Sequence, residues 1–120
     1  MDFFELLDGL LAELNIPFYE GAPEFERSPP ETFITYNIYD VPNLRGCGNE
    51  MTANYHLTLN IYTTGNNKKS RAVNVCTALT ALLVRHGFIR QGGSFGLMND
   101  FPRYYHRIIE FNYDYDKGDD

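Results

Sequence analysis

The chain has 120 residues, 43% of them hydrophobic and 22% charged, which is enough for one globular domain, placed at 1–120, and too short for two. The formal net charge is −6, whereas a protein that grips DNA phosphates over a large surface is normally basic, so duplex binding is disfavoured. The sequence has no run of about 18 apolar residues and no basic start followed by an apolar block, so we expect neither a membrane span nor a signal peptide. We therefore expect the protein to be made in the cytoplasm.

Apolar residues near the N-terminus recur at intervals of three and one, which predicts an α-helix over 3–14. Asp2 is expected to cap this helix, and Glu5 stands at the capping-box position. Asn15 and Pro17 are expected to end it. The leucines of the apolar stripe are interpreted as core residues.

Two strands and two irregular segments are expected next. Residues 16–19 are compatible with a short strand, and 20–31 carry three prolines, which favours an extended arm on the surface. Residues 33–39, "FITYNIY", alternate as a strand. Residues 40–53 are rich in glycine and would form a hairpin loop much longer than the usual two to five residues. Loops of that length are often functional, and we expect this one to be mobile until the protein assembles.

The segment "NYHLTLNIYTT", residues 54–64, is the clearest strand in the chain. Its apolar face, which must meet a core, consists of Tyr55, Leu57, Leu59 and Ile61. Its second face is polar without being charged and consists of His56, Thr58, Asn60 and Tyr62. Water, a ligand, a metal or another subunit would each suit this second face.

A second helix is predicted over 70–86, with Gly87 as the residue that ends it. Lys68 and Lys69 do not suit the positive end of a helix. Either Ser70 caps the helix and the lysines precede it, which we favour, or their charge is kept for contact with another molecule.

The rest of the chain predicts a second hairpin. Residues 88–91 form a short strand, 92–102 a glycine-rich loop and 104–113 a long strand, and the acidic C-terminal residues are expected to be a solvated tail. The whole chain then predicts an α+β fold, in which an antiparallel sheet of about four strands carries two helices packed on it.

The sequence holds no spacing that signals chemistry. Among its histidines and cysteines there is no CxxC, HxxxH or HExxH, so no metal, cofactor or catalytic residue is assigned and the chain is not expected to be an enzyme. Cys47 and Cys76 are not expected to form a disulfide in a reducing compartment. His56 and His106 would approach each other only if their strands pair.

Several segments resemble the tail terminator, or tail completion, proteins of long-tailed bacteriophages and prophages, which are often labelled minor capsid proteins. Members of that family are similar in having a first helix, a "P-x-x-F/Y-I-x-Y" strand, a Tyr-rich strand ending in "I-Y-T/S", a helix ending in "G-F" and a "Y-x-R" strand. The corresponding segments here are Pro30–Tyr36, Tyr55–Thr64, Ser70–Phe88 and Tyr104–Phe111. The likeness covers nearly the whole chain.

The resemblance implies a structural virion protein that caps the tail tube and joins it to the head. Such proteins form a ring, usually of six copies, at the head-proximal end of the tail. The implied partners are further copies of the chain, the tail tube protein and a head-completion or connector protein, with DNA only as cargo passing through the ring. The net negative charge is compatible with a monomer in dilute solution.

Positive charge at loop tips and rigid tyrosines suggest where subunits meet. The candidate interface residues are Arg45, Tyr62, Lys68, Lys69 and Tyr104. The alternative function is a small α+β ligand-binding or enzymatic domain that uses His56 and His106, together with the glycine loops, as a pocket.

Overall fold

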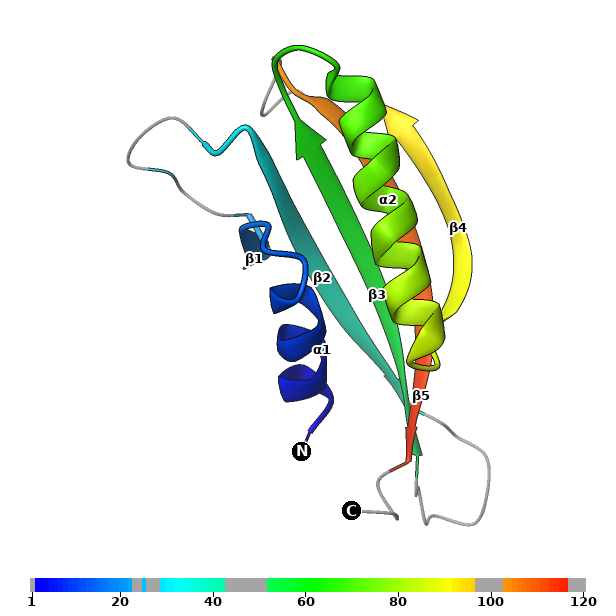
Figure 1. Ribbon diagram of the computed structural model, residues 1–120. Coiled ribbons are helices and arrows are strands. Elements are labelled where there is room, and N and C mark those ends of the chain that lie inside the picture. Colours follow the sequence, from blue (N-terminus) through cyan, green and yellow to red (C-terminus); the bar gives the residue numbers. More distant parts are fainter. Residues whose placement is uncertain (1, 23–24, 26–28, 43–51, 97–102, 117–120) are drawn as a thin grey trace.

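The structure is a computed structural model that describes residues 2–22, 25, 29–42, 52–96 and 103–116. A sheet of five strands, in the order β1-β2-β3-β5-β4, carries both helices on one face (Figure 1). The elements are α1 (Phe3–Ala12), β1 (Phe18–Glu20), β2 (Thr32–Pro42), β3 (Thr52–Thr63), α2 (Lys68–Arg85), β4 (Ile89–Gly96) and β5 (Tyr105–Asp116). The predicted α+β fold is confirmed.

The sheet is mixed, because β1 lies parallel to β2 while the other three pairs are antiparallel. Parallel neighbours need a crossover connection, and the connection between β1 and β2 lies in the predicted proline-rich arm, 20–31. Of the described residues of this arm, Phe25 packs edge-to-face on Phe33 with ring centroids 5.3 Å apart.

The first helix begins as the sequence predicts. The Asp2 carboxylate accepts a hydrogen bond from the Glu5 amide at 2.8 Å, which satisfies one of the free donors at the helix start. The helix ends at Ala12, and Asn15 then adopts a left-handed φ of 56° that turns the chain toward β1.

The central strand β3 alternates as predicted, because Tyr55, Leu57, Leu59 and Ile61 are all buried beneath the helices. β3 lies between β2 and β5, where its residues pair on both sides. The buried residues of α1, α2 and β5 that meet it are Phe3, Leu7, Leu10, Leu11, Ala72, Cys76, Leu79, Leu82, Leu83, Ile109 and Phe111. One core therefore joins both helices to the sheet.

The predicted boundaries of both helices and of several strands differ from the structure. The second helix includes Lys68 and Lys69, and its N-cap is Asn67 rather than Ser70. The turn before it is fixed by left-handed Gly65 and Asn67; a hydrogen bond from the Thr63 hydroxyl to the Lys68 carbonyl oxygen at 2.7 Å helps hold this turn. The predicted end of α2 is confirmed, since Gly87 has a φ of 95°.

The other differences lengthen strands. β4 continues to Gly96 through the segment expected to be a glycine loop, with an irregularity between Arg90 and Gly92. β5 continues to Asp116, so the start of the acidic C-terminal segment is strand. β2 and β3 extend into the predicted 40–53 loop, whose remaining residues, 43–51, lie outside the described residues.

Adjacent phenylalanines in α1 provide a test of this packing. Phe3 is 1% exposed and stacks on Tyr55 with ring centroids 4.0 Å apart, whereas Phe4 is 48% exposed. We expect Phe3→Ala to lower the free energy of unfolding by about 3–5 kcal/mol, and Phe4→Ala to lower it by about 1 kcal/mol or less. Urea unfolding of both variants beside the unmodified protein measures this; equal losses would contradict the assigned orientation of α1.

Candidate functional site

The outer face of the sheet, meaning the face away from the two helices, is divided into two halves with different surroundings. The half near the end of β3 includes Tyr62 and is buried, and the half near its middle and start includes Thr58 and His56 and is partly exposed. Register places Phe33 and His106 on either side of Tyr62. The second face of β3 is therefore buried by the protein itself in one half and partly open to solvent in the other.

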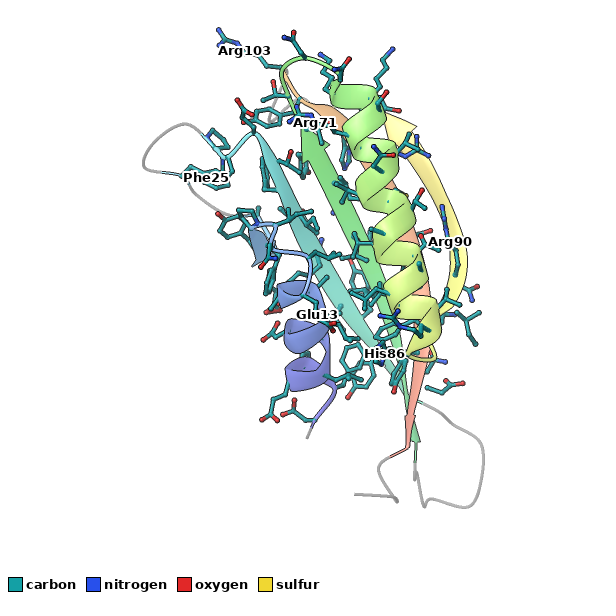
Figure 2. The ribbon with its side chains drawn as sticks, in the orientation of Figure 1. Glu13, Phe25, Arg71, His86, Arg90 and Arg103 are labelled. Carbon is teal, nitrogen blue, oxygen red and sulfur yellow. The ribbon has the colours of Figure 1, made fainter. Side chains whose placement is uncertain are left out.

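Aromatic rings fill the buried half. Phe33, Tyr62 and His106 lie face to face in a row, with centroids 4.7 Å apart for Phe33 and Tyr62 and 4.6 Å apart for Tyr62 and His106. Tyr104 packs edge-to-face on Phe33 with ring centroids 5.5 Å apart. Phe25 of the arm also packs edge-to-face on Phe33. Figure 2 labels Phe25 on the arm beside β2. This half is covered by the chain's own aromatic residues.

The arm is also held by hydrogen bonds. The Tyr104 hydroxyl is shared between the carbonyl oxygens of Pro29 and Pro30, at 3.0 and 2.9 Å. Burial of this hydroxyl, followed by the nearby charge of Glu31, raises the pKa of Tyr104. Tyr104 therefore fastens the arm to the start of β5 within one subunit.

His106 is the most unusual polar residue of this half, because it is 1% exposed. Its Nε2 lies 2.8 Å from the amide oxygen of Asn60, which fits a neutral ring donating from Nε2. Its Nδ1 has no hydrogen-bond partner among the described residues. Burial lowers the pKa of His106, because a charged imidazolium is poorly solvated there.

The other half of the outer face is polar and open to solvent. His56 donates from Nδ1 to the Asn112 amide oxygen at 2.8 Å, and its Nε2 lies 3.5 Å from a Glu110 carboxylate oxygen. Tyr39 lies beside His56 and is 60% exposed. These side chains make a preformed, hydrogen-bonded surface that is suited to contact with another molecule.

The two histidines do not form one site. Both lie on the outer face, but His106 pairs with Tyr62, six positions further along β3 than His56, so about 20 Å of strand separates them at about 3.3 Å per residue. Among the described residues there is also no group of three His, Cys, Asp or Glu side chains able to hold a metal ion. The described part of the chain therefore does not bring the side chains of His56 and His106 together.

The candidate interface residues lie in different places. Tyr62 and Tyr104 are occupied within the subunit by the aromatic stack and the arm. Lys68 and Lys69 stand in the first turn of α2, and Arg45 lies outside the described residues. Among the other tyrosines of the sheet, Tyr39 is exposed, whereas Tyr36 is buried and its hydroxyl donates to Asp8 at 3.1 Å.

Tyr36 shows how closely α1 is bound to β2. Burial raises the pKa of Tyr36 to about 12, with the Asp8 charge and hydrogen bond as further causes. Because this hydroxyl stays protonated at neutral pH, its hydrogen bond to Asp8 persists and fixes the position of α1. Tyr36 therefore stabilises the contact between α1 and β2 and is not part of an exposed contact surface.

Comparison of the sequence with protein-family models and with curated proteins finds no match. Within the described part of the chain, no helix is long and apolar enough to cross a membrane. The geometry consists of a rigid sheet with one closed half, one open polar half and two helices behind it. Such a surface can bind another molecule.

The buried His106 predicts a pH dependence of stability. Its pKa in the folded protein lies below the ordinary value of 6.5, so between these two values the unfolded chain binds more protons than the folded one. The free energy of unfolding should therefore fall as the pH is lowered through this window, by up to about 1.4 kcal/mol per pH unit.

The measurement is urea unfolding from pH 7.5 to pH 5. His106→Gln, which retains an N–H donor for Asn60, should show a shallower fall than the unmodified protein. His86→Gln is the control, because His86 is exposed at the end of α2. Identical pH profiles for the His106 variant and the unmodified protein would contradict the assigned burial.

Proposed function

We propose that the chain is a structural protein of a bacteriophage or prophage virion, a tail terminator that caps the tail tube and joins it to the head. It acts as a homo-oligomeric ring at the head-proximal end of the tail and carries out no reaction. Its partners are further copies of itself, the tail tube protein and a head-completion protein, and DNA passes through the ring as cargo.

The observation that carries this proposal is the coincidence of motifs with structural elements. The "P-x-x-F/Y-I-x-Y" motif enters β2, the Tyr-rich "I-Y-T" strand is β3, the helix ending in "G-F" is α2, and "Y-x-R" opens β5. The order of helix, long hairpin, helix and hairpin is the order that the resemblance implies. Each motif therefore falls on a helix or a strand of the protein, which supports the proposal.

The shape of the subunit suits assembly. The molecule is elongated, with extents of 53 × 27 × 24 Å, and its sheet ends in two edge strands, β1 and β4. Large apolar side chains remain exposed on α1, α2 and β4, namely Phe4, Val73, Val84 and Ile89. Contacts between unlike surfaces of identical subunits close into a ring when the rotation between neighbours permits it.

Weak attraction for DNA also suits a ring through which DNA moves. The net charge of −6 opposes tight, general binding to phosphates. Lys68, Lys69 and Arg103 gather at the end of the sheet where α2 begins, because the Thr64 hydroxyl donates to the Arg103 carbonyl at 3.0 Å. We place this end of the subunit toward the DNA channel.

Complementation of the phage or prophage that encodes the chain tests this function. A deletion mutant should produce headless tails of irregular, overgrown length, because nothing stops the tube or joins it to a head. Adding the purified protein to these tails with filled heads should restore infectious particles, counted as plaques and viewed by electron microscopy.

The control is purified Phe3→Ala protein, whose weakened fold should make it complement less well than the unmodified protein. Tails of normal length that join heads in the deletion mutant would rule the proposal out. So would a failure of correctly folded, unmodified protein to restore joining.

A further inference from the structure

A groove runs along the outer side of α2, between that helix and the β4 edge of the sheet, with a volume of about 610 Å³. Its walls combine aliphatic and cationic side chains. The residues that matter for its chemistry are Val73, Thr80, Val84, Arg85, Arg90 and Arg107. Among the described residues that line the groove, none is acidic.

The arginines of the groove lack acidic partners. The ion pairs among the described residues join His56 to Glu110 and Arg71 to Glu31, so no described carboxylate lies within 4.0 Å of the three groove arginines. Arg90 is instead directed by the Thr80 hydroxyl at 3.3 Å, and Arg107 donates to the Tyr105 hydroxyl at 3.4 Å. The Nε of Arg107 is buried without a partner among the described residues, and such a group is stabilised by an anion.

The opposite side of the molecule carries the complementary chemistry. Residues 2–22 contain no Lys or Arg, and α1 and its caps expose the acidic side chains of Asp2, Glu5, Asp8 and Glu13. The exposed ring of Phe4 stands among them. By contrast, α2 contains no Asp or Glu. Acidic and apolar groups thus occur together on α1, and basic and apolar groups occur together at the groove.

The two surfaces cannot meet within one subunit. Figure 1 shows α1 over the β1–β2 side of the sheet and α2 over the β3–β5–β4 side. Figure 2 labels Glu13 at the C-terminal end of α1 and Arg90 on the far side of α2, over β4. Since α2 itself stands between α1 and the groove, only the α1 of another molecule can reach it.

We propose that the α2–β4 groove binds the α1 helix of a second copy of this chain. Glu5 and Glu13 then face Arg85 and Arg90, and Phe4 contacts the aliphatic wall of the groove at Val84. The contact joins unlike surfaces, so it repeats from one subunit to the next. Only the closure of this contact into a ring rests on the proposed function.

Charge reversal on each surface tests the contact in the isolated full-length protein. Two variants are made: a groove variant, Arg85→Glu with Arg90→Glu, and a helix variant, Glu5→Lys with Glu13→Lys. All four positions are exposed, so both variants should fold, which circular dichroism checks. Self-association is followed by sedimentation and by the concentration dependence of the Val73 and Val84 methyl NMR signals, up to the solubility limit.

Each variant alone should associate at least about tenfold more weakly than the unmodified protein, because like charges then face each other. An equimolar mixture should recover association, because each reversed surface finds its complement on the other variant. Arg103→Glu is the charge control for Arg90→Glu, since Arg103 is exposed outside the groove, and it should leave the methyl shifts unchanged.

Methyl signals that do not move with the concentration of unmodified protein, or a mixture that associates no better than its components, would overturn the proposal. Methyl signals that move on addition of a short duplex DNA, and not with protein concentration, would also overturn it and assign the groove to a polyphosphate. Failed complementation together with recovered association would refute tail termination and leave this contact standing. Successful complementation without recovered association would do the reverse.

Discussion

The central strand β3 sets the constraint on which the rest of the molecule depends, because it has neighbours on both sides and must satisfy two faces. Its inner face buries four large apolar residues beneath α1 and α2, and a slip of one residue would expose all of them. The same register places Tyr62 between Phe33 and His106 on the outer face. The parallel pairing of β1 with β2 then brings the arm back over these rings, where Tyr104 holds it. The core, the aromatic stack and the arm are thus consequences of one register.

The same arrangement leaves the subunit electrically asymmetric. The acidic helix α1 is fixed over one side of the sheet by Phe3 and by the Tyr36–Asp8 hydrogen bond, and the basic helix α2 is fixed over the other. Neither charge surface is required by the core, since the buried residues of both helices are apolar. Separating opposite charges on the surface does not stabilise a monomer. In a protein that contacts copies of itself through unlike surfaces, the same separation sets the orientation and the specificity of the contact. This asymmetry links the fold to the proposed ring.

Sequence patterns predicted the local features well and the long-range ones poorly. The Asp2 cap, the alternation of β3 and the turn at Gly87 follow from neighbouring residues, and the structure confirms them. His106 is buried where it stacks on Tyr62 and bonds Asn60, and these partners lie more than 40 residues away in the chain, so its burial does not follow from the alternation of its own strand. β4 was read mostly as loop because Gly92, Gly93 and Gly96 usually break strands, although pairing with β5 carries them into the sheet. The start of α2 was displaced because left-handed Asn67, which lacks a side-chain capping bond, is an unusual N-cap.

The central claim is that copies of the chain form a ring at the junction of tail and head. The most direct test of this claim is to locate the chain in assembled particles. A short epitope fused after Asp120, with gold-labelled antibody and electron microscopy of intact virions and of separated tails, gives this location. We expect label at the head–tail junction of virions and at one end of separated tails, with several copies at each site. Label distributed along the tube, confined to the distal tip or absent from purified virions would contradict the account.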